Sequence, residues 1–422
     1  MKKIVKVVIA GCGSRGRIYA SYSKAHPEGM KIVGIAEPDN VYREMMAVQY
    51  NIAPENTFKN WQEMAKYPKF ADAIIIAVQD NMHANATAAF AEKGYDILLE
   101  KPMAITEQEC RNIVDTVVSK GIIFAVCHVM RYTEYTRQLK EMIHNDLIGD
   151  IVSVQHLEPV GYWHQAHSYV RGNWRNSSES SFMLMTKSCH DLDWLRYIME
   201  SRCIKISSFG NLKHFRKANK PVRASDRCLE CCYKDECPYS ATKIYLALAQ
   251  RGIFSWPVNV ITEDFSIDGV KEALQAGPYG RCVYECDNDV VDHQVVNMLF
   301  ENESTASFTM TAFDFVGQRR TSIFGTKGCI QGNGENITYL DFRTGHKSVI
   351  EIGISDDGTL LTGHGGGDYE LIKSFLSAVA QKDSSRIYSG PEETLETHLS
   401  VFAAERSRLE SRVLCYTSEG WV

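Results

Sequence analysis

The sequence predicts an α/β chain in which a doubly wound parallel sheet is followed by an α+β domain with a large, mainly antiparallel open sheet. Three observations predict this arrangement. Apolar strands alternate with amphipathic helical segments up to residue 127. The first strand ends in a glycine-rich turn, and later segments such as 306–313 alternate apolar and polar residues like a half-exposed sheet. We therefore expect one domain over residues 1–127 and a second over residues 128–422.

The individual elements follow from these patterns in chain order. Apolar runs at 4–10, 32–36, 73–78, 97–99 and 122–126 are the expected parallel strands. Thr106 and Glu109 match a capping box at a helix start, while Gly94 and Gly121 stand where two helices should end. Beyond them we expect a helix from residue 131 to residue 148, a strand over 151–157, a cysteine-rich insertion over 214–284 and a final amphipathic helix over 391–411.

The turn after the first strand has the spacing of a dinucleotide-binding loop. Gly11 suits a tight turn, Gly13 suits the close approach of a pyrophosphate, and Gly16 suits the packing of a helix against the strand. Amide groups at the start of the following helix would face the phosphates. The residues expected to form this loop are Gly11, Cys12, Gly13, Ser14, Arg15 and Gly16.

An acidic residue, Glu37, ends the second strand 21 positions beyond Gly16. A carboxylate there accepts ribose hydroxyl protons and repels a 2′-phosphate, so the sequence favours NAD over NADP unless Arg15 or Arg43 offsets its charge. The strand, the spacing and the acid together predict a nicotinamide dinucleotide site. The alternative is a glycine turn that binds no nucleotide.

Composition excludes several classes of function. The chain of 422 residues has a net charge of −6, with 44% hydrophobic and 23% charged residues, as in an ordinary globular protein. This charge offers no general attraction for nucleic acid or an anionic membrane, and no stretch approaches transmembrane length. Thirteen cysteines without an export signal favour reduced thiols and a cytoplasmic location.

Two candidate acid–base groups occupy positions that suit a ligand crevice. Lys101 follows the strand at 97–99, and open α/β sheets bind ligands beyond the carboxyl ends of their strands. Beside a hydroxyl, a lysine donates a hydrogen bond or, if partly desolvated, accepts a proton. Lys187, His190 and Asp191 share a helix face, so His190 could take the hydroxyl proton as the carbon loses hydride. The alternatives are an exposed lysine at a strand end and a structural histidine.

These motifs together resemble the Gfo/Idh/MocA oxidoreductase family over nearly the whole chain. The resemblance rests on the glycine loop, Glu37, the segment 77–83, Glu100-Lys101-Pro102, and His190 with Asp193. It implies a Rossmann domain followed by an α/β domain whose open sheet covers the crevice and often mediates oligomerisation, here into a homodimer or homotetramer. It also implies activity on sugars, inositols and their derivatives, with Lys101 and His190 matching the family's lysine and histidine.

One position departs from the family pattern. The family's aspartate four positions before the histidine is Thr186 here, with Lys187 beside it. The usual trio of lysine, aspartate and histidine is therefore incomplete. Either a different group anchors the substrate, or Lys187 contributes the charge.

Further ligand-binding residues are expected along the crevice. The loop after the strand at 73–78 matches the family's cofactor loop and offers Gln79, Asn81 and His83; a helix start without a ligand is the alternative. Glu100 and Lys101 are also expected to contact the cofactor. Aromatic and basic side chains suit a polyhydroxylated ligand, because rings stack on sugar C–H faces and guanidinium groups bind bidentately, although a packed loop has the same composition. The expected substrate-binding residues are Arg131, Trp163, Arg175, Thr186, Asp191 and His364, the last in a glycine run that opens a helix.

The insertion contains clustered cysteines. Cys228, Cys231 and Cys237 have the short loop spacing of a tetrahedral zinc site, to which Cys282, Cys286 or a histidine could add a fourth ligand. An iron–sulfur cluster or free thiols are the alternatives. Such a metal would hold the insertion together and would not transfer hydride.

The sequence therefore predicts an NAD-dependent oxidoreductase that transfers hydride between nicotinamide and a carbinol carbon of a sugar, inositol or related polyol. His190 would act as the acid–base group, and Lys101 would polarise the oxygen. One alternative is a redox-assisted lyase or hydrolase that keeps NAD bound and cleaves glycosides. Another is a dinucleotide-sensing binding protein, which Thr186 favours slightly and the retention of Lys101 and His190 opposes.

Overall fold

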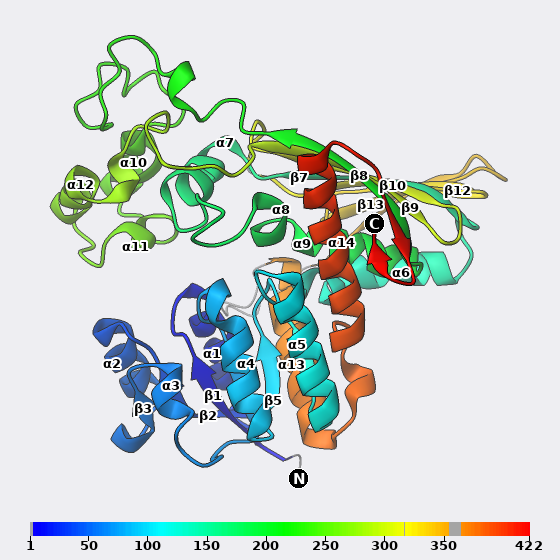
Figure 1. Cartoon of the computed structure of the whole chain (residues 1–422), viewed down its shortest axis with the longest axis horizontal. Coiled ribbons are helices and arrows are strands. Elements are labelled where there is room, and N and C mark those ends of the chain that lie inside the picture. Colours follow the sequence, from blue (N-terminus) through cyan, green and yellow to red (C-terminus); the bar gives the residue numbers. More distant parts are fainter. Residues whose placement is uncertain (1–2, 316, 354–363) are drawn as a thin grey trace.

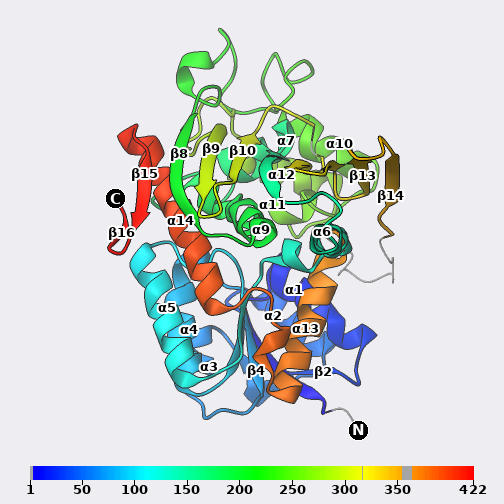
Figure 2. The same cartoon turned by 90° about the vertical axis from the view of Figure 1, so that its right-hand side faces the viewer.

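Two β-sheets form the frame of the molecule (Figures 1 and 2). The computed structural model describes residues 3–315, 317–353 and 364–422. The first sheet has six strands in the order β3-β2-β1-β4-β5-β6, and all of their pairings are parallel. The strands are β1 Val5–Ala10, β2 Met30–Ala36, β3 Thr57–Phe58, β4 Ala73–Ile76, β5 Asp96–Leu99 and β6 Phe124–Val126.

Helices cover both faces of this parallel sheet. Alternate side chains of β1 enter two separate cores: Val7 and Ile9 pack with residues of one face, and Val8 and Ala10 with residues of the other. Burial on both faces explains why the strands read as nearly continuous apolar runs. The helices of this part are α1 Ser14–Ala25, α2 Asn40–Gln49, α3 Trp61–Met64, α4 His83–Glu92 and α5 Glu107–Lys120.

Several helices begin or end at the capping residues that the sequence predicts. Thr106 Oγ1 accepts a hydrogen bond from the Glu109 amide at 3.2 Å and starts α5, while Gly121 ends that helix with a left-handed φ of 60°. Gly94 has a φ of 73° just beyond α4. The helix predicted up to residue 148 is shorter, α6 Glu134–His144, because the Thr133 side chain caps its start and Asp146 adopts a φ of 59° beyond its end.

The second sheet is larger and mixed. Its order is β14-β13-β12-β11-β7-β10-β9-β8-β15-β16, and β7 with β10 is the parallel pair in an otherwise antiparallel arrangement of the described strands. The predicted fold class is therefore confirmed. The strands are β7 Ile151–Pro159, β8 Cys203–Asn211, β9 His293–Phe300, β10 Thr305–Thr311, β11 Arg320–Gly325, β12 Gly328–Gly332, β13 Asn336–Asp341, β14 Lys347–Glu351, β15 Leu414–Thr417 and β16 Gly420–Trp421.

Four helices join the two sheets. Helices α8 Met183–Thr186 and α9 Cys189–Met199 lie between the large sheet and the parallel-sheet domain (Figure 1). Helices α13 Gly367–Gln381 and α14 Pro391–Glu410 come late in the chain and pack back against the first domain, α13 beside α1 and α14 beside α5. The helix predicted over 391–411 is thus confirmed as α14, but β15 and β16 follow it.

The insertion has a core of its own at one end of the large sheet. It contains α10 Ala247–Gln250, α11 Val258–Ile261 and α12 Ile267–Ala276, which pack against α7 Tyr162–His164 and the helical turn Gln165–Arg171. Cys228, Tyr245 and Val270 are among the buried residues of this core. Across the described part of the chain, every helix is too short or too polar to cross a membrane.

Candidate active site

The glycine loop leaves room for a dinucleotide at the end of β1. A Cβ atom on Gly11 would lie 2.3 Å from the Ala77 carbonyl oxygen, and one on Gly16 would lie 2.0 Å from the Gly11 carbonyl oxygen. A Cβ atom on Gly13 would meet nothing within 4 Å, so the loop is open on that side. Among the described residues no side chain caps the start of α1, which leaves its first amide groups available to an anion. The residues of the loop therefore fit a pyrophosphate.

Glu37 lies beside this loop, as its position after β2 predicts. Its Oε2 accepts a hydrogen bond from the Cys12 amide at 2.6 Å, and its Oε1 accepts one from the Asp39 amide at 2.9 Å. Arg43 donates to the Glu37 carbonyl oxygen at 2.7 Å, so its guanidinium lies close by. Burial and the Glu37 charge raise the pKa of the Cys12 thiol to about 12, which leaves this cysteine neutral.

Three residues expected to bind the cofactor are engaged inside the protein instead. Arg15 Nε donates to Glu100 Oε1 at 2.6 Å, and the same guanidinium pairs with Asp368 on α13. His83 is fully buried, and its two ring nitrogens face the carbonyl oxygens of Pro102 and Val78. Arg15, His83 and Glu100 therefore position the loops around the crevice, and Arg15 is not free to offset Glu37. Gln79 and Asn81 remain exposed beside this region.

Lys101 reaches across from the first domain to the second. Its amide donates to Glu100 Oε2 at 2.8 Å, and its Nζ donates to the Thr186 carbonyl oxygen at 2.7 Å. The backbone beyond it is held by His398 of α14, whose Nε2 accepts the Met103 amide hydrogen at 2.9 Å. Among the described residues no carboxylate forms an ion pair with Lys101, so the ammonium charge is available to a ligand.

His190 lies in the first turn of α9 and is 7% exposed. Burial lowers its pKa well below the ordinary value, and the charges of Lys101, His128, His364 and Arg319 lower it further. Its imidazole is therefore neutral at pH 7 and can accept a proton. Its Nδ1 is buried and has no hydrogen-bond partner in the described part of the chain. The ring centre of His364 lies 6.3 Å from that of His190, and His364 Nδ1 contacts Asp368 Oδ2 at 2.9 Å.

A cluster of charged side chains surrounds Lys187 and Asp191. Lys187 Nζ lies 3.0 Å from Glu158 Oε1, and Arg319 Nε lies 3.0 Å from Glu158 Oε2 while it donates to Asp191 Oδ1. His156 Nε2 contacts Asp191 at 3.0 Å. Glu158 and Arg319 were absent from the sequence prediction because they lie on or beside strands far from α9 in the chain. The alternation of buried residues along β7 was the available signal for Glu158.

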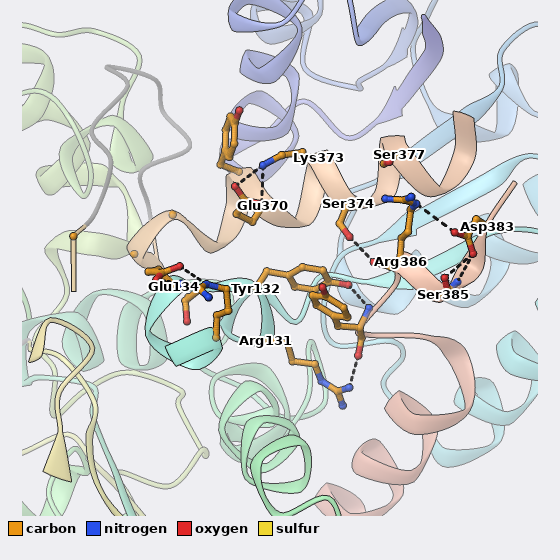
Figure 3. A pocket seen from close by; sticks show the side chains of 17 residues that line it. Arg131, Tyr132, Glu134, Glu370, Lys373, Ser374, Ser377, Asp383, Ser385 and Arg386 are labelled. Atoms are coloured by element: carbon orange, nitrogen blue, oxygen red, sulfur yellow. Dashed lines mark hydrogen bonds and ion pairs between the residues drawn. The ribbon is translucent and has the colours of Figure 1, made fainter. Parts of the chain in front are cut away.

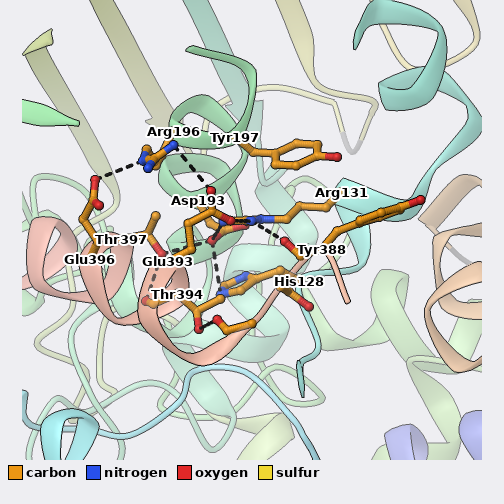
Figure 4. Close-up of polar contacts among 12 residues, drawn as sticks. His128, Arg131, Asp193, Arg196, Tyr197, Tyr388, Glu393, Thr394, Glu396 and Thr397 are labelled. Carbon is orange, nitrogen blue, oxygen red and sulfur yellow. Dashed lines mark hydrogen bonds and ion pairs between the residues drawn. The ribbon is translucent and has the colours of Figure 1, made fainter. Parts of the chain in front are cut away.

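Arg131 and Arg175 do not contact the crevice in the way we expected. Arg131 is 2% exposed and forms two hydrogen bonds of 2.7 Å with Asp193; it also binds the Tyr388 carbonyl oxygen and Glu393 (Figure 4). Its guanidinium is thus an internal clamp. Arg175 binds Asp287 at 2.9 and 3.0 Å near the insertion. Both corrections have one cause: a nearby carboxylate that sequence spacing does not reveal.

Aromatic side chains of the second domain cluster beside the insertion core. The ring centres of Trp163 and Trp256 are 5.0 Å apart, and Trp256 belongs to the insertion. His164 lies 5.0 Å from Trp256, and its pKa is lowered by burial and then by the charge of Lys187. Trp174 Nε1 donates to Asp80 Oδ2 of the first domain at 3.3 Å. Trp163 therefore belongs to an aromatic cluster that packs on the insertion core, and its role in substrate binding stays a prediction.

The cysteine cluster does not form the predicted metal site. All thirteen cysteines are free thiols, and among the described residues no group of three or more His, Cys, Asp or Glu side chains is arranged to hold a metal ion. Cys228 instead accepts a hydrogen bond from the buried Arg171 at 3.4 Å and joins the insertion core. The prediction of zinc at Cys228, Cys231 and Cys237 is not supported.

A separate cavity of about 930 Å³ lies between α13 and residues 131–137 (Figure 3). Its labelled lining is strongly polar, and most of its charges are paired with each other, as Lys373 with Glu370 and Arg386 with Asp383. Lys101 and His190 are not part of its lining. This cavity is therefore distinct from the crevice.

Comparisons with known proteins agree with this geometry. Residues 5–128 match the oxidoreductase family NAD-binding Rossmann fold, and residues 140–415 match the C-terminal alpha/beta domain of the same family. The 2,7-anhydro-N-acetylneuraminate hydratase of Mediterraneibacter gnavus is 25% identical over 50% of this chain and 54% of its own. The scyllo-inositol 2-dehydrogenase (NAD(+)) of Bacillus subtilis is 24% identical over 50% of this chain and 59% of its own. The matched region thus spans little more than half of each of these two relatives.

Solved structures show the same fold at low sequence identity. An oxidoreductase from Agrobacterium radiobacter, solved in complex with NAD+, L-tartaric acid and magnesium, superposes with a TM-score of 0.70 at 13% identity and covers 98% of each chain. Together the two family matches span nearly the whole sequence. The chain therefore belongs to the Gfo/Idh/MocA oxidoreductase family, with an NAD-binding Rossmann fold and the family's C-terminal alpha/beta domain.

Proposed function

We propose that this chain is an NAD-dependent dehydrogenase that oxidises a secondary hydroxyl of a sugar, inositol or related polyol, and that it also runs this reaction in reverse. The observation that carries the proposal is the meeting of Lys101 and His190 between the two domains. Lys101 is the strongest charge that lowers the pKa of His190. A cationic donor and a neutral imidazole therefore share one site beside the glycine loop.

The residues divide the work of oxidation between them. The Lys101 ammonium donates a hydrogen bond to the reacting oxygen and stabilises the negative charge that develops there. The neutral His190 accepts the hydroxyl proton. When bound, NAD supplies the hydride acceptor, so that one hydride and one proton leave the carbinol and a carbonyl group results. The interdomain bond from Lys101 Nζ to the Thr186 carbonyl oxygen marks the position a substrate oxygen would take.

Other residues of the crevice suit a polyhydroxylated substrate. Lys187, Glu158 and Arg319 offer donors and acceptors for further hydroxyl groups. Trp163 and Trp256 present rings that can stack on C–H faces. The relative named for scyllo-inositol supports this class of substrate. Glu37 beside the Cys12 amide, with Arg15 held by Glu100, supports NAD over NADP.

The test is turnover with a panel of polyols. Purified protein with NAD should reduce the cofactor in the presence of at least one sugar, inositol or sugar acid. Replacing Lys101 with alanine should abolish that turnover while NAD still binds in a calorimetric titration. Near-normal turnover by this variant would contradict the role of Lys101.

A second candidate is redox-assisted elimination or hydration with NAD retained. It is favoured by the relative named as a 2,7-anhydro-N-acetylneuraminate hydratase. When bound, NAD would take the hydride and later give it back, while Lys101 and His190 would hold the reacting oxygen and move its proton in each direction. Release of a product without net formation of NADH would distinguish this reaction from simple dehydrogenation.

A further inference from the structure

Three imidazole nitrogens without partners are buried together beneath the proposed catalytic histidine. They are His190 Nδ1, His128 Nδ1 and His128 Nε2, and within the described residues no hydrogen bond reaches any of them. His128 is 0% exposed and lies two residues beyond β6, the last strand of the parallel sheet. Buried polar atoms without partners are rare in folded proteins, and each calls for a physical reason.

The two histidine rings are neighbours, and the second of them lies beside a carboxylate, so that His190, His128 and Asp193 form a row of side chains. The ring centres of His190 and His128 are 5.6 Å apart with their planes at 80°. On the far side, His128 Nε2 lies 3.6 Å from Asp193 Oδ1. Asp193 is fixed by two hydrogen bonds from Arg131 at 2.7 Å and one from Thr397 at 3.0 Å (Figure 4). These hydrogen bonds therefore fix the orientation of the Asp193 carboxylate beside His128.

One arrangement of protons satisfies all three nitrogens at once. His190 must keep Nε2 unprotonated to accept the substrate proton there, so its neutral form carries hydrogen on Nδ1. That N–H can donate to His128 Nδ1, which places the hydrogen of His128 on Nε2, facing Asp193. All the hydrogen bonds then run in the same direction, from substrate hydroxyl to carboxylate. A small shift of the side chains, or one bridging water, completes each contact.

We propose that His128 is a positioning residue that, together with Asp193, holds His190 in the tautomer and orientation needed to accept the substrate proton. This inference rests on the proposed function of His190. When His190 takes the proton, its Nδ1–H remains bound to His128, and the Asp193 charge stabilises the cation through the neutral ring between them. Burial keeps the pKa of His128 low, at about 3, so that it stays an acceptor.

The other charged groups around the row are accounted for. Lys101, Arg131 and His398 face His128, and Lys101, His364 and Arg319 face His190. His398 is already occupied, since its Nε2 accepts from Met103 and its Nδ1 contacts the Thr394 carbonyl oxygen at 2.7 Å. Asp193 is thus the carboxylate that can accept a hydrogen bond from His128.

The test combines kinetics with a readout that needs no turnover. With the polyol that is oxidised, H128F should lower kcat about 100-fold, because the base loses its orienting partner, while KM and NAD affinity change less than about threefold. H128Q keeps one donor and one acceptor and should recover part of the loss. H128F removes the ring that links the His190 N–H to Asp193, so protonated His190 loses that stabilisation and the acid limb of the kcat/KM profile should move to lower pH. Exposed His346 provides the control, H346F, which should match the parent protein.

Nitrogen-15 NMR of histidine-labelled protein with NAD bound tests the same row directly. The inference predicts that His190 carries its hydrogen on Nδ1 and His128 on Nε2, and that H128F converts His190 to a mixture of tautomers. His190 with its hydrogen on Nε2 in the parent protein, or unchanged kcat and pH profile in H128F, would overturn the inference. If no polyol is oxidised, the proposed function fails, and the tautomers still decide whether the row exists.

Discussion

Moving the pH from 7 to 5 should destabilise this protein partly through His128. Burial lowers the pKa of this histidine to about 3; the Asp193 charge opposes that shift, and His398, Arg131 and Lys101 add to it. The unfolded chain has an ordinary histidine pKa of about 6.5. At a pH between these two pKa values, His128 binds a proton in the unfolded state but not in the folded state. The contribution of neutral His128 to the free energy of unfolding is therefore fully present above about pH 6.5 and is lost as the pH falls toward 3.

The size of the effect follows from the same two values. At pH 5 the unfolded state gains about 2 kcal/mol from protonating this one side chain. The assay is urea unfolding at pH 7 and pH 5, followed by tryptophan fluorescence, for the parent protein, H128Q and the exposed control H346Q. The free energy of unfolding should fall by about 2 kcal/mol less in H128Q than in the other two. Equal losses in all three proteins would refute the reasoning.

Four other predictions follow from the site and the fold. Replacing Lys101 with alanine should lower kcat at least about 100-fold and change the NAD dissociation constant less than about threefold, as stopped-flow kinetics and calorimetry will check. Arg131→Met should leave Asp193 buried without its cation and lower stability by about 3–5 kcal/mol in denaturant unfolding; a change below about 1 kcal/mol would contradict the clamp. Glu37→Ser should raise NADP affinity relative to NAD, and an unchanged ratio of dissociation constants would argue against ribose recognition by Glu37. Light scattering should give the mass of a homodimer or homotetramer, because the large open sheet leaves a hollow of about 700 Å³ over β7, β10, β11, β12 and β13 that a second copy can cover; a monomer mass would contradict this.

The parallel-sheet domain could be predicted from the sequence because its signals are local. Strands buried on both faces read as apolar runs, and the caps at Thr106 and Gly121 depend on residues within one or two turns. Gly11 and Gly16 are required by contacts with neighbouring backbone, which a glycine pattern records. The short strand β3 was missed, since two residues carry no periodicity.

The rest of the site depends on contacts between distant parts of the chain. We predicted that Arg131 binds substrate because its ion-pair partners, Asp193 and Glu393, are more than 60 positions away in the sequence. Glu158 and Arg319 join Lys187 through the large sheet, and α13 brings Asp368 to Arg15 across more than 350 positions. The zinc prediction failed because spacing along a loop does not ensure that thiols converge. These side-chain contacts depend on how distant segments pack together, and residue spacing along the sequence does not reveal them.

Absorbance of reduced nicotinamide is the measurement that tests the central claim most directly. The protein with NAD is mixed in turn with sugars, inositols and sugar acids, and the same panel is given to Lys101→Ala and His190→Ala. Our account predicts that at least one polyol produces NADH and that both variants lose this signal while each still binds NAD. The absence of any signal despite NAD binding, or a full signal in either variant, would contradict it.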